Sequence, residues 1–345
     1  MSLLKQRGIP VYKTEQGFKY PWAIDYYKKH DVAVWHDHEY TLSQDIQDYA
    51  KASPEERKDL EDIMALFVQN DVEATTGYEA LLRIMKPMEI RLMLGSSLAR
   101  EGTHVFNYAN FVETLGLPAS TFTAFLDRPV MSIKMDYLEK AKVRKYEDYK
   151  AVGMSDAQVD NEFRRAVARM LAVYAGGLEG ISLMAQFAML LEYQFEGKYP
   201  GLCTIVEWSI KDEMMHLISN CHLFRVYIEE NLDIWDDELK FDIYEAIREV
   251  VAHEHALIDS LGKGEKFKRY VEYMADNALA ELGMKKNWFV ANPLQYMDDV
   301  VGYQLTDFFS GSVTEYSKSV EGSWSDVTFD HWKPENTDKA HTDLI

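Results

Sequence analysis

Two copies of a Glu-x-x-His motif lie in stretches of helical periodicity, Glu101-Gly-Thr-His104 and Glu213-Met-Met-His216. Three residues turn an α-helix by about 300°, so the glutamate and the histidine of each motif project from one face, about one turn apart. Carboxylate oxygens and imidazole nitrogens are metal ligands. Two such motifs, with one carboxylate from each of two further helices, are the donor set by which four-helix bundles hold a pair of metal ions.

Two further acidic residues, Asp71 and Glu179, complete the donor set that the sequence predicts. Glu179 precedes an apolar run at residues 181–191, where an unpaired acid would be costly to bury. For Asp71 the same argument is weaker, since Asn70 and Glu73 indicate a polar patch. The predicted ligands are Asp71, Glu101, His104, Glu179, Glu213 and His216.

This donor set also restricts the metal. Four carboxylates and two neutral imidazoles balance two divalent cations, which makes the site close to electroneutral, as burial requires. Donors that are mostly oxygen, with one nitrogen for each metal, favour iron or manganese over copper(I) or a structural zinc ion.

Tyr108 follows His104 by four residues and therefore shares its helical face. In a chain with 21 tyrosines, one alternative is an ordinary packed side chain. The functional interpretation is a phenol that a nearby dimetal centre oxidises and that an apolar pocket then protects as a radical. Leu183, Phe187 and Ser209 are the candidates for the wall of that pocket.

A third segment is rich in ligand-type residues, Glu249-Val-Val-Ala-His253-Glu-His255. Its acid and histidine are four residues apart and its histidines two apart, which differs from the paired motif. We interpret it as a solvated or intersubunit helix face.

The composition favours a helical protein without a nucleic-acid or membrane partner. Gly and Pro are few (18 and 9) in 345 residues, the chain is 47% hydrophobic and its net charge is -20, with no basic cluster. Neither a signal peptide nor a transmembrane helix is expected, because no apolar run reaches about 18 residues. Cys203 and Cys221 are expected to be buried small side chains rather than a disulfide, which suits the cytoplasm.

Several helices are expected to position the predicted ligands. Ser53-Pro54 opens one of them, with a capping serine and proline at the first turn. The other long helices are expected at about 88–115, 155–191, 202–230, 236–260 and 265–285, with a turn at 197–201 and shorter helices at 118–150. Residues 1–40 are expected to form an extended arm on the body, and residues 143–162 have no clear assignment.

Three stretches of the chain resemble the radical-generating small subunit of class I ribonucleotide reductase: residues 100–108, 178–181 and 211–216. The resemblance covers nearly the whole chain. It implies an all-α, ferritin-like helical bundle at residues 1–308 and a flexible C-terminal tail at 309–345. Asp307-Phe-Phe-Ser-Gly-Ser-Val-Thr-Glu-Tyr316 is similar to the segment that leads to a mobile tyrosine in some members of the family.

The resemblance also implies a role for each site residue. Asp71, Glu101 and His104 would bind the first metal, and Glu179, Glu213 and His216 the second. Tyr108 would carry the stable radical, Trp35 would pass an electron towards the metals, Asp212 would link the Trp35 indole to His104, and Tyr316 would relay the radical between subunits. The cofactor would be two iron ions in a di-iron-oxo centre, or two manganese ions activated by a flavodoxin-like partner.

The sequence departs from the family in two places, since Lys211 stands where arginine is frequent and Leu183 where an aromatic residue is frequent. The retained tyrosine and carboxylates argue against members that lack the radical tyrosine or the metals. We therefore expect a homodimeric small subunit of ribonucleoside-diphosphate reductase, with the large subunit docked on its tail. The rival functions are a ferritin-like dimetal oxidase or hydroxylase with its own small substrate, and a non-enzymatic scaffold or iron-storage protein.

Overall fold

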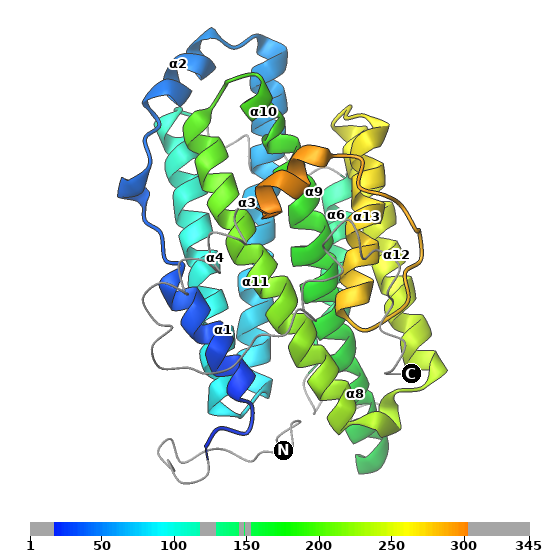
Figure 1. Cartoon of the computed structure of the whole chain (residues 1–345). Coiled ribbons are helices and arrows are strands. Elements are labelled where there is room, and N and C mark those ends of the chain that lie inside the picture. Colours follow the sequence, from blue (N-terminus) through cyan, green and yellow to red (C-terminus); the bar gives the residue numbers. More distant parts are fainter. Residues whose placement is uncertain (1–16, 118–128, 145–147, 149–152, 303–345) are drawn as a thin grey trace.

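The computed structural model describes residues 17–117, 129–144, 148 and 153–302, and this part of the chain is a bundle of helices (Figure 1). Within it α1 spans Pro21–Val32, α2 Ser43–Lys51, α3 Pro54–Ile84, α4 Met88–Thr114, α6 Pro129–Ala141, α8 Asp156–Leu171, α9 Met184–Leu190, α10 Glu192–Phe195, α11 Pro200–Glu230, α12 Asp237–Ser260 and α13 Glu265–Glu281. Three shorter or wider helices accompany them: η1 at Asp37–Glu39, η2 at Ala172–Leu183 and η3 at Leu232–Ile234. The predicted all-α, ferritin-like fold is confirmed.

Local capping explains where the long helices begin. The Ser53 side chain accepts a hydrogen bond from the backbone N–H of Glu56 at the start of α3. Ser155 forms a capping box with Gln158 at the start of α8, and Asp236 caps α12 through the N–H of Leu239. The sequence signals for these helix starts are therefore correct.

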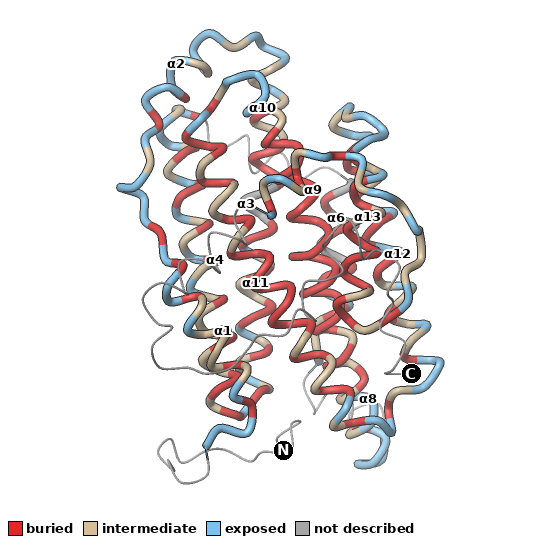
Figure 2. Tube along the Cα trace, in the orientation of Figure 1, coloured by how far each residue is buried: buried red, intermediate tan, exposed pale blue. Residues whose placement is uncertain are grey.

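The core of the bundle lies between α3, α4, α11 and the continuous rod made by α8, η2 and α9, which run side by side (Figure 1). Helices α12 and α13 pack against η2 on one side, and α1 packs against α4 and α11 on the other. Figure 2 shows that burial is concentrated along η2, α9 and the middle of α11. The rod that contains η2 is thus surrounded by other helices.

This rod is apolar enough to raise the question of a membrane. Residues Asp156–Phe195 form the one described helical stretch long and apolar enough for a bilayer. Its 18-residue window has a mean hydropathy of 1.2, and 94% of that window is buried inside the bundle. We therefore interpret it as a core helix. Cys203 and Cys221 are both buried and free, as the sequence predicts.

The segment η2 is a π-helix, whereas the sequence pattern predicts a regular α-helix through residues 155–191. All of its residues are buried. Its glycines allow close approach to neighbouring helices, since a Cβ atom on Gly180 would lie 2.8 Å from Leu217 of α11 and one on Gly177 would lie 3.0 Å from Val250 of α12. π-Helical turns occur often at functional sites, because they change the direction in which a side chain projects.

Two expectations about the chain's path are wrong. Residues 21–32 of the predicted extended arm form helix α1, which begins with Pro21 at its first turn and buries Ala23, Tyr26 and His30. The predicted turn at 197–201 ends earlier than expected, because α11 begins at Pro200. The buried Asp45 carboxylate of α2 accepts hydrogen bonds from the first backbone N–H groups of α11 and so fixes that start.

Candidate metal centre

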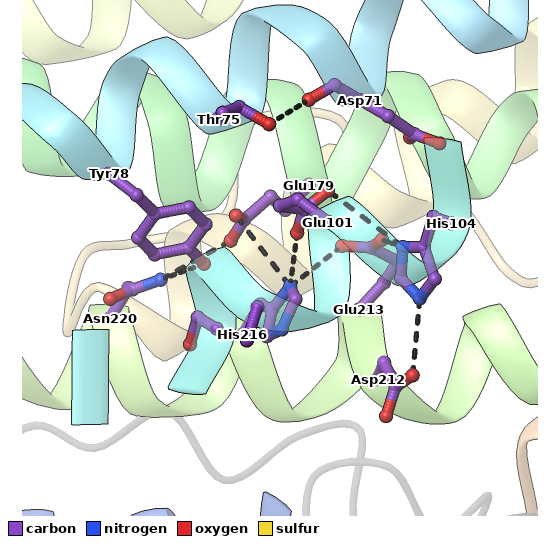
Figure 3. A network of polar contacts seen from close by, with 12 residues as sticks. Asp71, Thr75, Tyr78, Glu101, His104, Glu179, Asp212, Glu213, His216 and Asn220 are labelled. Atoms are coloured by element: carbon purple, nitrogen blue, oxygen red, sulfur yellow. Dashed lines mark hydrogen bonds and ion pairs between the residues drawn. The ribbon is translucent and has the colours of Figure 1, made fainter. Parts of the chain in front are cut away.

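The six predicted ligands converge in the middle of the bundle (Figure 3). Asp71 comes from α3, Glu101 and His104 from α4, Glu179 from η2, and Glu213 and His216 from α11. Glu179 is 2% exposed and the other five are fully buried. The side chains form two overlapping groups in which one donor atom from each residue lies within 4.8 Å of the others. The first group is Asp71, Glu101, His104 and Glu213, and the second is Glu101, Glu179, Glu213 and His216.

The two imidazoles direct the same ring nitrogen into this cluster. His104 Nδ1 lies 2.9 Å from Glu213 Oε1, and His216 Nδ1 lies 2.9 Å from Glu101 Oε1 and 3.1 Å from Glu213 Oε2. Each histidine therefore approaches the glutamate of the opposite motif. Glu101 and Glu213 lie between the two histidines and belong to both groups of donors.

Many donor atoms of the cluster are buried without a hydrogen bond. They include both carboxylate oxygens of Asp71, both of Glu101, Glu213 Oε1 and His104 Nδ1. His104 Nδ1 lies 2.9 Å from Glu213 Oε1, and Glu101 Oε1 lies 2.9 Å from His216 Nδ1, but the angles at these atoms are not those of a hydrogen bond. Buried polar atoms in native proteins are normally satisfied. The pattern fits a pair of cations as the missing partners.

The electrostatics of the cluster support the same conclusion. Burial raises the pKa of the Asp71 and Glu179 carboxyls well above the ordinary range, and the neighbouring glutamates add to the effect. The two imidazoles are the basic groups among the six ligands, and the neighbouring carboxylates raise their pKa values well above the ordinary value although burial alone would lower them. Bound divalent cations would supply the positive charge that these carboxylates need.

One of the two histidines is connected to an outer carboxylate and an indole. His104 Nε2 lies 3.1 Å from Asp212 Oδ2, and the same oxygen accepts a hydrogen bond of 2.9 Å from Trp35 Nε1. The Trp35 and His104 rings are nearly parallel, with centroids 6.0 Å apart. Burial alone would raise the pKa of Asp212, but the hydrogen bond and charge of His104, the charge of His216 and the hydrogen bond from Trp35 outweigh it and hold that pKa below its usual value.

Tyr108 lies beside the cluster in a dry environment. Its ring is fully buried, and its hydroxyl donates a hydrogen bond of 2.9 Å to Ser209 Oγ. Burial raises the pKa of this phenol well above its ordinary value, with a further contribution from Asp71. Leu183 and Phe187, the other two residues predicted for the pocket, are also fully buried.

The sequence reading missed two residues that hold Glu179, Tyr78 of α3 and Asn220 of α11 (Figure 3). The Asn220 amide donates to the Tyr78 hydroxyl at 2.8 Å and to Glu179 Oε2 at 3.4 Å. A hydrogen bond from the Tyr78 hydroxyl lowers the pKa of Glu179, although burial dominates that pKa. Tyr78 follows Asp71 by seven residues and Asn220 follows His216 by four, so helical spacing from the predicted ligands could have identified both.

The segment at residues 249–255 differs from the solvated face that its spacing suggests. His253 and Glu254 are buried, and the fully buried Lys134 of α6 lies 3.1 Å from Glu254 Oε1. Ser182 of η2 donates to the same oxygen at 2.7 Å. The prediction is wrong for these two residues, because a lysine 120 positions away neutralises the acid. Glu249 is exposed as expected, and His255 is half-buried.

The sequence matches the family model described as "Ribonucleotide reductase, small chain" over residues 15–293. The chain belongs to this family. All six predicted ligands, Tyr108, Trp35 and Asp212 lie inside the matched region. Tyr316 and the predicted tail at 309–345 lie outside the described residues.

Individual relatives agree with the family assignment. A probable ribonucleoside-diphosphate reductase small subunit of Invertebrate iridescent virus 6 is 30% identical over 95% of this chain and 99% of its own length. Among solved structures, the ribonucleotide reductase R2 subunit from Clostridium botulinum superposes with a TM-score of 0.74 at 19% identity, covering 87% of this chain and 94% of that one.

Two further structures share the fold and differ in their descriptions. The ribonucleotide reductase Rnr4 homodimer from Saccharomyces cerevisiae has a TM-score of 0.68 at 18% identity, covering 87% of this chain and 90% of that one. An R2-like ligand-binding oxidase with a Mn/Fe cofactor has a TM-score of 0.60 at 17% identity, covering 79% of this chain and 100% of that one. The fold is thus common to reductase subunits and to an oxidase.

Proposed function

We propose that this chain is the radical-generating small subunit of a ribonucleoside-diphosphate reductase, in which a dimetal site oxidises Tyr108. The observation that carries the proposal is the cluster of six buried donor side chains, several without hydrogen-bond partners, beside a fully buried phenol. The family assignment and the sequence relatives named as reductase small subunits support it.

In this proposal Asp71, Glu101 and His104 hold one metal ion, and Glu179, Glu213 and His216 hold the other. Two iron ions bound there, with O₂ as the oxidant, would supply the oxidising power that removes one electron from Tyr108 as its phenol loses a proton. Two manganese ions are the alternative, with a flavodoxin-like activator to provide the oxidant. The oxygen-rich donor set suits both metals.

The surrounding residues position these ligands and protect the phenol. Asp212 accepts the Nε2–H of His104, which fixes the tautomer that leaves Nδ1 for the metal. Trp35 donates to the same carboxylate and so forms a continuous indole–carboxylate–imidazole connection for an electron. The closed environment of Tyr108 excludes water and reductants, and its hydroxyl proton is held towards Ser209.

The partners follow from the same proposal. The large subunit binds the ribonucleotide and docks on the tail at 309–345, while Tyr316 relays the radical between the subunits. The chain acts as a homodimer in the cytoplasm, and the Rnr4 homodimer among the structural neighbours supports the dimer. The net charge of -20 argues against a nucleic-acid partner.

Electron paramagnetic resonance tests the radical directly. Full-length protein loaded with Fe(II) and exposed to O₂ should give a tyrosyl signal that Tyr108→Phe abolishes. Tyr227→Phe is the matched control, because Tyr227 is equally buried but bonds to the Arg164 carbonyl. If the wild type gave no tyrosyl signal with iron and O₂ or with manganese and superoxide, the reductase proposal would fail. Oxidation of a small substrate without the large subunit would instead favour the oxidase.

Truncation after Phe309 tests the docking role separately. The truncated chain should keep the Tyr108 signal and lose turnover with the large subunit, since only the tail is removed. Turnover at the wild-type rate would contradict the role assigned to residues 310–345.

A further inference from the structure

A second buried histidine lies next to the ligand cluster, and the function proposed above gives it no role. His30 of α1 is 1% exposed, and its ring meets the ring of His216 edge to face, with centroids 5.2 Å apart. Among the described residues its ring has one hydrogen-bond partner, the Ser96 hydroxyl, and no carboxylate partner, and a buried imidazolium without such a partner would be costly, so we take the ring as neutral.

The contacts of Ser96 determine which nitrogen of His30 carries the proton. The Ser96 hydroxyl donates to the Met93 carbonyl at 2.7 Å, so its single hydrogen is already used. Its oxygen lies 2.8 Å from His30 Nδ1 and must therefore accept a hydrogen bond from that nitrogen. His30 consequently has its proton on Nδ1 and a lone pair on Nε2, and this Nε2 is buried without a partner.

His216 has a hydrogen-bond donor without an acceptor on the corresponding nitrogen. Its Nδ1 faces Glu101 and Glu213 inside the cluster. When Nδ1 is a metal ligand, the neutral imidazole carries its proton on Nε2. That nitrogen is also buried without a partner. A donor that lacks an acceptor thus lies beside an acceptor that lacks a donor.

We propose that His30 is the positioning residue of His216: in the metal-loaded protein its Nε2 accepts the Nε2–H of His216 through one water molecule. His30 would do for this histidine what Asp212 does for His104. The acceptor beside His216 would be a neutral imidazole, whereas the acceptor beside His104 is the Asp212 carboxylate. The two histidine ligands would therefore differ in basicity. The inference depends on the proposed function, because it requires His216 to bind metal through Nδ1.

Titration of the full-length protein with Mn(II), followed by the signal of the free ion, separates a positioning role from simple packing. His30→Leu keeps most of the volume and removes the acceptor. It should weaken binding of one of the two ions by about ten- to a hundredfold, the usual effect of losing an outer-shell partner, and leave the other unchanged. His30→Gln, which offers an amide oxygen as acceptor, should recover most of the affinity. His222→Leu is the control, because that half-buried imidazole stacks on Trp22 instead.

The tautomer can be read without any activity assay. In Zn(II)-loaded protein labelled with ¹⁵N-histidine, His30 should carry its proton on Nδ1, and a proton on Nε2 would overturn the inference. Equal Mn(II) affinities in wild type, His30→Leu and His30→Gln would also overturn it while the metal site stands. A wild-type chain that binds fewer than two Mn(II) ions would instead refute the proposed function itself.

Discussion

The bundle buries two clusters of ionisable side chains that differ in where their positive charge comes from. In the cluster on α6, α12 and η2, Lys134 lies against Glu254 and holds its pKa well below the ordinary value despite burial. In the cluster of six ligands no lysine or arginine is a member, and the pKa values of Asp71 and Glu179 are raised. The acid of the first cluster has its cation within the fold, whereas the carboxylates of the second have only the two imidazoles among their own group, an arrangement that fits two added metal ions.

The largest difference in metal binding is expected between removing a carboxylate of the ligand cluster and removing one from the segment at residues 249–255. Glu213 belongs to both groups of donors, so Glu213→Ala should abolish binding of both metal ions, a loss beyond the roughly hundredfold effect of an outer-shell change. Metal analysis after loading with Fe(II) or Mn(II) measures the stoichiometry. The control is Glu249→Ala, an exposed acid of the other ligand-rich segment, which should still bind two ions. Two ions bound by Glu213→Ala would contradict the assignment.

In the Lys134–Glu254 cluster the opposite result is expected, a loss of stability with metal binding unchanged. Lys134→Met leaves Glu254 buried without its cation and should lower the free energy of unfolding by about 3–5 kcal/mol, with metal stoichiometry unchanged. Guanidinium denaturation measures this loss. The double variant Lys134→Met/Glu254→Leu should recover most of it, because no uncompensated charge remains. If the single variant were as stable as the wild type, the ion pair would not be the feature that neutralises this cluster.

A smaller effect is expected from the hydroxyl that holds Glu179. Tyr78→Phe removes a hydrogen bond to Glu179 and an acceptor for Asn220, so one metal ion should bind about tenfold more weakly. Titration with Mn(II) resolves the two affinities, and Tyr227→Phe provides a buried tyrosine as control. Unchanged affinity would show that Glu179 is positioned by η2 alone.

The smallest difference is expected in how the free energy of unfolding falls at acid pH. Because the folded pKa of Glu254 lies below its ordinary value of 4.5, its stabilising contribution is present above about pH 4.5 and is lost as the pH falls through the folded value. Below pH 4.5 the metal-free wild type should therefore lose stability more steeply than Lys134→Met/Glu254→Leu. Denaturation at a series of pH values measures the two slopes, and equal slopes would contradict this role of Glu254.

The sequence was sufficient for the features that depend on local spacing. Glu101 and His104, and likewise Glu213 and His216, are three residues apart, so each helix alone determines that they share a face. Asp71 and Glu179 could be added because an isolated acid in an apolar stretch is costly to bury. Helix starts at Ser53 and Ser155 followed from capping chemistry, which also acts within a few residues.

Features that depend on distant contacts could not be predicted in this way. Lys134 is 120 residues from Glu254, so nothing near Glu254 signals that its charge is compensated. The π-helical segment η2 packs against α11, α12 and α13, which are contacts that the spacing within residues 172–183 does not show. Helix α1 was missed because Tyr26 and His30 make its buried face, and neither residue type signals burial reliably.

Crystals of the full-length chain loaded with Mn(II) and measured near the manganese absorption edge test the central claim most directly. Two anomalous peaks are expected, one bounded by Asp71, Glu101, His104 and Glu213 and the other by Glu101, Glu179, Glu213 and His216. A single peak, no peak there, or peaks beside His253 and His255 would contradict the account.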